Sequence, residues 1–216
     1  PTDRKISMKR TLAFAASLLL LGACSSDGYT IRGKIAGLDN PYVYLLRYTG
    51  EVEVIDSAKV TKGDFVFKGK AEQPEVVYLS TDKQQPFVHF FLENGRISVD
   101  GALSAPADIA VLGTPSNDIQ RAFDEKIAAL EEEFAKAGND VQRDSLRKEY
   151  SKLMSDAVEM NRDNIYGVTT FLNNAYAFLS PEEVMEQIAL FPAEWQQRTE
   201  LTDLRKVMEQ RLRTTG

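Results

Sequence analysis

The sequence is poor in the side chains that carry most enzyme chemistry. Its 216 residues contain one cysteine and one histidine. A single Cys cannot form a dithiol redox pair, and one His without a second His or Cys does not make a set of metal ligands. The sequence also has no glycine-rich phosphate-binding loop. We therefore expect no catalytic residues, no metal site and no cofactor.

The only cysteine, Cys24, stands at the end of an apolar run. Residues 8–24 read MKRTLAFAASLLLLGAC, with two basic residues followed by uncharged, mostly apolar ones. The apolar run of about 13 residues is too short to cross a bilayer, which needs about 20. The order basic, apolar, small is typical of a secretory signal peptide. We expect residues 1–23 to be that leader, with Met8 as its true start.

The residues around the cysteine carry a more specific resemblance. Leu21-Gly22-Ala23-Cys24 resembles the bacterial lipobox. The resemblance implies that Leu21, Gly22 and Ala23 form the cleavage site and that the Cys24 thiol is lipidated. Acyl chains would then hold the protein at a membrane, at about 0.8 kcal/mol per buried CH₂. The alternative is an ordinary buried helix that contains a Cys.

In lipobox proteins an Asp directly after the Cys retains the protein at the inner membrane. Ser25 stands here instead, which favours the outer membrane, facing the periplasm or the surface.

Charge argues against two classes of partner. Residues 1–23 hold four Lys or Arg and one Asp, so removing them changes the formal net charge from −6 to −9. An acidic protein is a poor ligand for nucleic acid and for anionic lipid. We expect no nucleic-acid partner and an anchor that is acyl rather than electrostatic.

From residue 29 to residue 113 the pattern is typical of short strands. We expect about seven or eight of them, rich in Val, Ile, Tyr and Phe and separated by turn residues. Because no helical spacer intervenes, an antiparallel β-sandwich or barrel-like sheet is predicted. Thr49-Gly50 and Asn94-Gly95 are expected as hairpin turns. Phe65 and Phe67 are expected to point into the core, and Val52 and Val54 to share a face.

After Pro115 the period becomes helical, and about five helices are expected. Apolar stripes begin with Ile119, Phe123 and Ile127, and Ser180-Pro181-Glu182-Glu183 is predicted to cap a helix start. The predicted organisation is a leader (1–23), a lipidated tether (24–28), a β-sandwich domain (29–113) and a helical domain (114–216). The fold class is α+β.

Three phrases of the strand region resemble one known module. They are Asp56-Ser57-Ala58-Lys59-Val60 with Gly63–Gly69, then Phe91–Gly101, and Gly113–Asp118 as the exit into a helix. The module is the sandwich domain of unknown function at the N-terminus of thioredoxin-like envelope lipoproteins of the alkyl-hydroperoxide-reductase/TlpA type. The resemblance covers residues 28 to 212. In that family a thioredoxin domain with Cys-x-x-Cys follows, and the present sequence contains no such motif.

Two functional hypotheses follow. The chain is a non-catalytic accessory module, held at the membrane, that orients a thioredoxin-like domain or a client protein; it is then a fragment of a longer reductase or a lipoprotein that keeps only this region. Alternatively it is a stand-alone surface or periplasmic lipoprotein that binds a glycan, peptide or protein, which exposed aromatic residues on the sheet would support.

Several other residues invite functional interpretations, each with a structural alternative. His89 is expected to be structural or exposed at an edge, and Asp56-Ser57 to lie at a turn or strand end. Glu131, Glu132 and Glu133, with Asp163, could bind a cation but are more typical of a solvated helix face. Trp195, Phe191 and Tyr176 could line a ligand pocket, but such aromatics more often fill a helical core.

Overall fold

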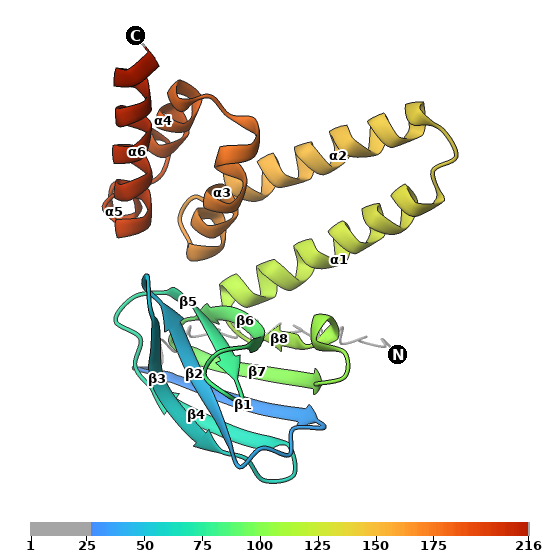
Figure 1. The fold of residues 1–216 in the computed structure, drawn as a ribbon, viewed down its shortest axis with the longest axis vertical. Coiled ribbons are helices and arrows are strands. Elements are labelled where there is room, and N and C mark those ends of the chain that lie inside the picture. The colour runs from blue at the N-terminus through green and yellow to red at the C-terminus, as the bar shows by residue number, and fades with distance from the viewer. Residues whose placement is uncertain (1–26, 216) are drawn as a thin grey trace, which may run out of the picture.

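The computed structural model describes residues 27–215, without the side chains of residues 175–178 and 215. The predicted leader, its cleavage site and Cys24 lie outside this part. A strand-rich region comes first and helices follow (Figure 1), so the predicted α+β class is confirmed. The strands are β1 (Tyr29–Ala36), β2 (Tyr42–Tyr48), β3 (Val52–Lys59), β4 (Asp64–Gly69), β5 (Glu75–Ser80), β6 (Pro86–Leu92), β7 (Gly95–Ala102) and β8 (Ala110–Leu112), with a 3-10 turn, η1 (Pro106–Asp108), before β8.

The strands form two four-stranded sheets that enclose one apolar core. The first sheet has the order β4-β1-β7-β8 and the second the order β3-β2-β5-β6. Alternate residues of each strand point inward, as the period of two requires. Phe65 and Phe67 are both buried as predicted, with ring centroids 5.8 Å apart. A Cβ on Gly33 would lie 1.9 Å from the Phe65 ring, so only glycine fits beneath that ring.

One strand pairing departs from the predicted antiparallel pattern, and one predicted turn is wrong. β1 and β7 are parallel, paired from Tyr29↔Gly95 to Ala36↔Ala102. The connection between them runs through the strands of both sheets, so no helical crossover is needed. Asn94-Gly95 is not a hairpin turn, because β6 and β7 belong to different sheets. The Asn94 amide bonds to the N–H and C=O of Ala71 at 2.9 and 2.8 Å, and this pairing directs the chain from one sheet to the other.

The helical region contains six helices within the described residues. They are α1 (Pro115–Lys136), α2 (Asp140–Glu159), α3 (Ile165–Phe178), α4 (Pro181–Ala189), α5 (Ala193–Gln196) and α6 (Thr199–Thr215). The predicted capping box is confirmed: the Glu183 N–H donates to Ser180 Oγ at 3.2 Å and the Ser180 N–H to Glu183 Oε2 at 2.7 Å. The short α5 was not expected; Pro192 stands at its N-cap.

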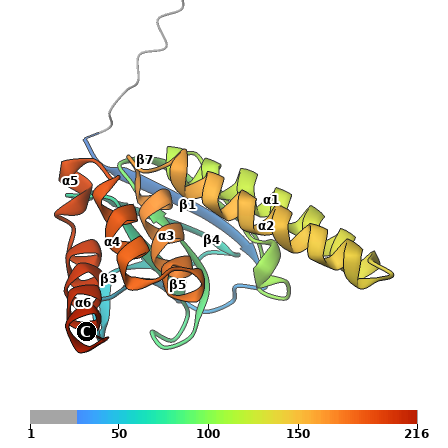
Figure 2. The same cartoon turned by 90° about the horizontal axis from the view of Figure 1, so that it is seen from above.

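The helices divide into a projecting pair and a compact group. α1 and α2 form an antiparallel hairpin that extends from the sandwich, as Figures 1 and 2 show, and α3 to α6 gather beside its base. The compact group has its own core, which includes Phe171, Ile188, Phe191, Leu204 and Met208. Among the helices of residues 27–215, none is both long and apolar enough to span a bilayer.

Aromatic rings join the sandwich to the helices. Phe91 of β6 contacts Tyr166 of α3 at 6.1 Å between centroids, and Tyr166 stacks on Phe123 of α1 at 5.5 Å. Val76 and Trp195 pack against the same cluster. The helical region is therefore seated on one end of the second sheet, over β5 and β6.

The junction should be sensitive to alkali. Burial raises the pKa of Tyr166 to about 12, whereas the unfolded phenol ionises near 10. The folded state therefore favours the neutral form, so this contribution is complete below pH 10 and lost as the pH rises from 10 to 12. Urea unfolding at pH 8 and pH 11.5 should show that Tyr166→Phe reduces the alkaline loss of stability by on the order of 2 kcal/mol. Tyr42→Phe, which changes an exposed tyrosine, should leave the alkaline loss of stability unchanged. Equal alkaline losses in the two variants would contradict the role given to Tyr166.

Candidate functional site

Tyrosines gather on the outward face of the second sheet. On β2 the residues at 42, 44, 46 and 48 alternate with Val43 and Leu45, which point into the sandwich core. Register pairs Leu46 with Val54 of β3 and with Tyr78 of β5. We call this surface the tyrosine face. It consists of Tyr42, Tyr44, Tyr48, Val52, Val54 and Tyr78.

The tyrosine face combines exposed rings with exposed aliphatic groups. Tyr48 is 41%, Val52 44% and Val54 43% exposed, whereas Leu46 beneath them is 0% exposed although it lies outside the sandwich core. The Tyr48 and Tyr78 rings meet edge to face, at 4.7 Å and 81°. Exposed large apolar groups that adjoin one another, unlike isolated ones, mark interaction surfaces.

The loop between β5 and β6 forms one border of this face. Asp82 accepts hydrogen bonds from the N–H groups of Gln85 (2.8 Å) and Gln84 (2.9 Å) and from the Ser80 hydroxyl (2.9 Å). These bonds, the one from Gln85 first, lower the pKa of Asp82. The loop so fixed places the Lys83 ammonium 4.6 Å from the centre of the Tyr44 ring. A cation thus borders the tyrosine face.

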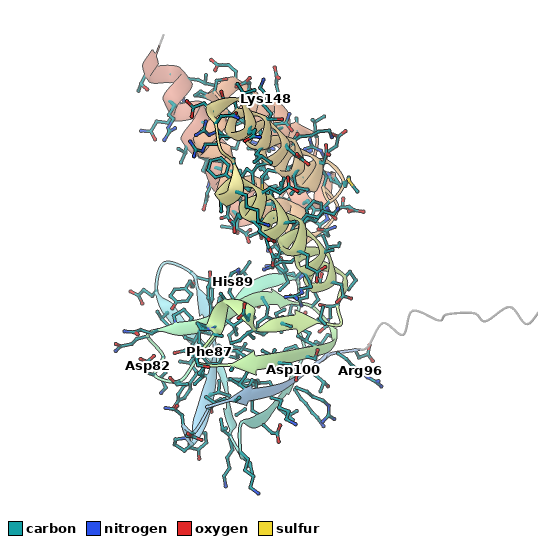
Figure 3. All side chains as sticks on the ribbon, turned by 90° about the vertical axis from the view of Figure 1, so that its right-hand side faces the viewer. Asp82, Phe87, His89, Arg96, Asp100 and Lys148 are labelled. Carbon is teal, nitrogen blue, oxygen red and sulfur yellow. The ribbon has the colours of Figure 1, made fainter. Side chains whose placement is uncertain are left out.

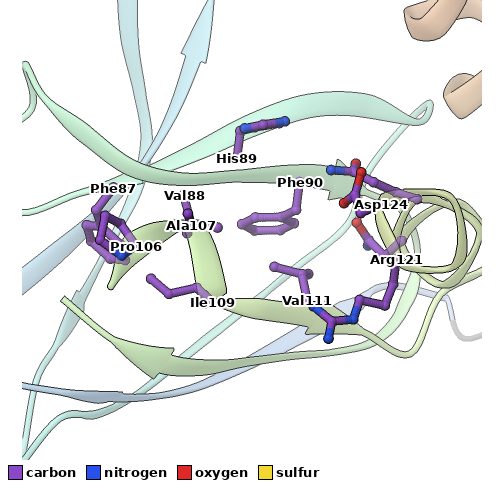
Figure 4. Close-up of a pocket in the computed structure, with 12 residues that line it drawn as sticks. Phe87, Val88, His89, Phe90, Pro106, Ala107, Ile109, Val111, Arg121 and Asp124 are labelled. Atoms are coloured by element: carbon purple, nitrogen blue, oxygen red, sulfur yellow. The ribbon is translucent and has the colours of Figure 1, made fainter. Parts of the chain in front are cut away.

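A pocket opens at the side of the sandwich, between the edge strands β6 and β8. Its volume is about 380 Å³, and η1 and α1 close its two ends. Val88, Phe90 and Ile109 form an apolar floor, and Arg121 and Asp124 of α1 stand at its end (Figure 4). Asp124 is accessible to solvent, yet the surrounding protein displaces enough water to raise its pKa.

An asparagine side chain seals the edge of β6 beside this pocket. Asn117 Oδ1 accepts from the Phe91 N–H at 2.9 Å, and its Nδ2 donates to the Phe91 C=O at 2.8 Å. These two bonds are the pair that a residue of a neighbouring antiparallel strand would make. Nδ2 also donates to Thr114 Oγ1 at 2.7 Å, and Asn117 is 2% exposed. Asn117 therefore substitutes for a strand at this point.

A third hollow lies in the helical region. It has a volume of about 880 Å³ and lies between the α1–α2 hairpin, α3 and α4. Phe134, Tyr150, Met154, Phe171 and Leu190 give it a mainly apolar lining. Phe134 of α1 and Tyr150 of α2 line this open cleft because the projecting hairpin leaves part of its inner face uncovered.

The other candidates from the sequence are dispersed. His89 is exposed on the edge strand β6, as expected, and Asp56 and Ser57 lie near the end of β3. The three consecutive glutamates of α1 and Asp163 are exposed, and in the described part of the chain no three His, Cys, Asp or Glu residues are grouped as metal ligands. Phe191 is in the helical core and Trp195 packs against two apolar clusters; nothing is described of the Tyr176 side chain.

One comparison with known proteins bears on this region. Residues 29–120 match the family described as Domain of unknown function (DUF4369). The match spans all eight strands and continues into the first turns of α1, so it includes Asn117. No curated protein matches the chain. The strand region is therefore similar to a family whose description assigns no activity.

Removing the Asn117 amide should expose its structural role. Asn117→Ala leaves the buried N–H and C=O of Phe91 without partners, and each unsatisfied buried group costs about 1–3 kcal/mol. Urea denaturation should show a loss of about 2–4 kcal/mol. The matched substitution Asn173→Ala, at an exposed position of α3, should change stability by less than about 0.5 kcal/mol. A small loss for Asn117→Ala would mean that water replaces the amide.

Proposed function

We propose that this chain is a lipid-anchored, non-catalytic module of the bacterial cell envelope that holds a protein partner against its tyrosine face. The observation that carries the proposal is the tyrosine face itself, where exposed rings and aliphatic side chains adjoin one another. Tyrosine is enriched at protein–protein interfaces, because its apolar ring can be buried while its hydroxyl group stays hydrated. The lipobox resemblance supports the anchor and the envelope location, with the outer membrane as the proposed destination.

A protein suits this surface better than a flat sugar ring. The 81° angle between the Tyr48 and Tyr78 rings prevents the two from forming one flat stacking platform. Val52 and Val54 add aliphatic area that a polar glycan cannot satisfy. The resemblance of the strand phrases suggests a thioredoxin-like domain as the partner, encoded in the same chain or separately. The alternative is a stand-alone surface or periplasmic lipoprotein that binds a glycan, peptide or protein, which the exposed tyrosines of the sheet also support.

Titration with a thioredoxin-like domain tests the proposal. The gene would be read in frame past Gly216, and its neighbours searched, for a domain with Cys-x-x-Cys. The purified domain would then be titrated into the ¹⁵N-labelled chain lacking residues 1–24. We expect shifts confined to β2, β3 and β5, and an affinity loss of about fivefold or more for Tyr48→Ser and for Val54→Ser, since interface centres carry most binding energy.

The control is Val141→Ser, which removes an exposed aliphatic group far from the sheet, on α2. It should bind like the unmodified chain. If no thioredoxin-like domain binds, and a glycan array instead gives a ligand that Tyr48→Ser abolishes, the glycan-binding alternative replaces the proposal. Reduction of insulin by the chain alone would overturn its non-catalytic part.

The anchor has its own test. Expressed in a bacterium with lipoprotein processing, the chain should lose residues 1–23 and carry a diacylglycerol on Cys24. Mass spectrometry of the N-terminal peptide should find this modification, and the protein should partition with membranes. Cys24→Ser should abolish both, whereas Ser25→Ala should abolish neither. An unmodified thiol on an uncut leader would contradict the anchor and the compartment together.

A further inference from the structure

The edge of β6 is sealed by Asn117 at Phe91 but open two residues earlier. In an antiparallel ladder, residues alternate between those whose backbone groups bond to the neighbouring strand and those whose groups point away from it. The N–H and C=O of Phe91 point away from β5, since they bond to Asn117. His89 pairs with Tyr78 in the same register two residues earlier, so its N–H and C=O point to the same side.

Among the described residues, these two groups of His89 have no hydrogen-bond partner. β6 ends the second sheet, so no strand of residues 27–215 lies beyond it. The pocket of about 380 Å³ opens at this place, lined by His89 and by the apolar side chains of Val88 and Phe90. In Figure 4 the His89 side chain points to the opposite side of β6 from Phe90. Figure 3 looks onto this side of the sandwich, with Phe87 and His89 below the helices.

We propose that the open edge at His89, with the adjoining pocket, binds a short extended peptide segment that carries a basic side chain. The peptide backbone exchanges two hydrogen bonds with His89, in the way that the Asn117 amide does with Phe91. One peptide side chain enters the apolar floor between Phe90 and Ile109. This is the strand-addition mode of peptide recognition, confined to a short stretch because η1 and α1 close the two ends.

Charge selects the basic side chain. Asp124 stands at the α1 end of the pocket, where the Gln120 side chain hydrogen-bonds to it and Arg121 is near enough to act on its charge, but it forms no salt bridge within residues 27–215. The nearby cation, Arg121, is engaged at 3.1 Å by Glu125 of the next helical turn. An ammonium group on the peptide would reach the Asp124 carboxylate. The negative net charge of the chain also favours a positively charged ligand.

The probe is the fluorescein-labelled peptide acetyl-TVKVT-amide, titrated with the full chain in detergent micelles and followed by anisotropy. We expect a Kd between about 10 µM and 1 mM, as suits a short segment. Two N-methylated versions, modified at odd or at even residues, separate strand addition from simple apolar binding. One version should bind about tenfold more weakly and the other nearly normally, because only alternate amides face β6.

The charge is tested by acetyl-TVEVT-amide and by Asp124→Asn. The unmodified chain should prefer the Lys peptide about tenfold, and Asp124→Asn should remove this preference while Asp163→Asn keeps it. Equal binding of both N-methylated peptides, no Lys preference, or no binding up to 1 mM protein would overturn the proposal. So would a dimer in sedimentation that pairs β6 with a second copy. Tyr48→Ser should leave peptide affinity unchanged, which separates this site from the tyrosine face.

Discussion

The arrangement of the two halves depends on a small set of buried polar bonds at the start of α1. Asn117 holds the edge of β6, and the Glu93 carboxylate accepts from the N–H and the hydroxyl of Ser116, at 3.1 and 2.6 Å. The carboxylate lies at the positive end of the helix, where it is favoured. Ser116 and Asn117 are 0% and 2% exposed, so these bonds have little competition from water. They fix where α1 leaves the sandwich, and so where every later helix lies.

Two asparagines make the same pair of backbone hydrogen bonds at different places. Asn94 pairs with both backbone groups of Ala71, and Asn117 with both of Phe91. Ala71 lies in the connection between β4 and β5, whereas Phe91 belongs to the edge strand β6, so only Asn117 blocks strand pairing at an edge. The edge at His89 has no such side chain. The Asn117 amide occupies the edge of β6 at Phe91, and the pocket lies beside the outward-pointing backbone groups of His89.

Local patterns in the sequence predict the elements better than their partners. The alternation of Phe65 and Phe67 and the capping box at Ser180 depend on neighbours in the chain, and both are confirmed. The Asn94-Gly95 pattern is equally local, but it does not form the predicted hairpin turn. The Asn94 side chain instead bonds to Ala71, which is distant in sequence. Asn117 belongs to the Gly113–Asp118 segment, but its role depends on Phe91, which is 26 residues earlier in a different element. The exposure of Val52 and Val54 likewise depends on where the helices sit, which no strand pattern contains.

The sandwich core and the outward face of the second sheet use different aromatic residues. Phe65 and Phe67 of the first sheet and Phe90 of the second pack the core, whereas the outward side of β2 and β5 carries tyrosines. A tyrosine ring covers Leu46 and its neighbours while its hydroxyl stays hydrated, so the surface tolerates solvent. The same rings gain apolar burial when a partner displaces that water. Phenylalanine at these positions would bury a similar apolar area when a partner binds. In the free protein it would expose more apolar surface than tyrosine and so reduce solubility.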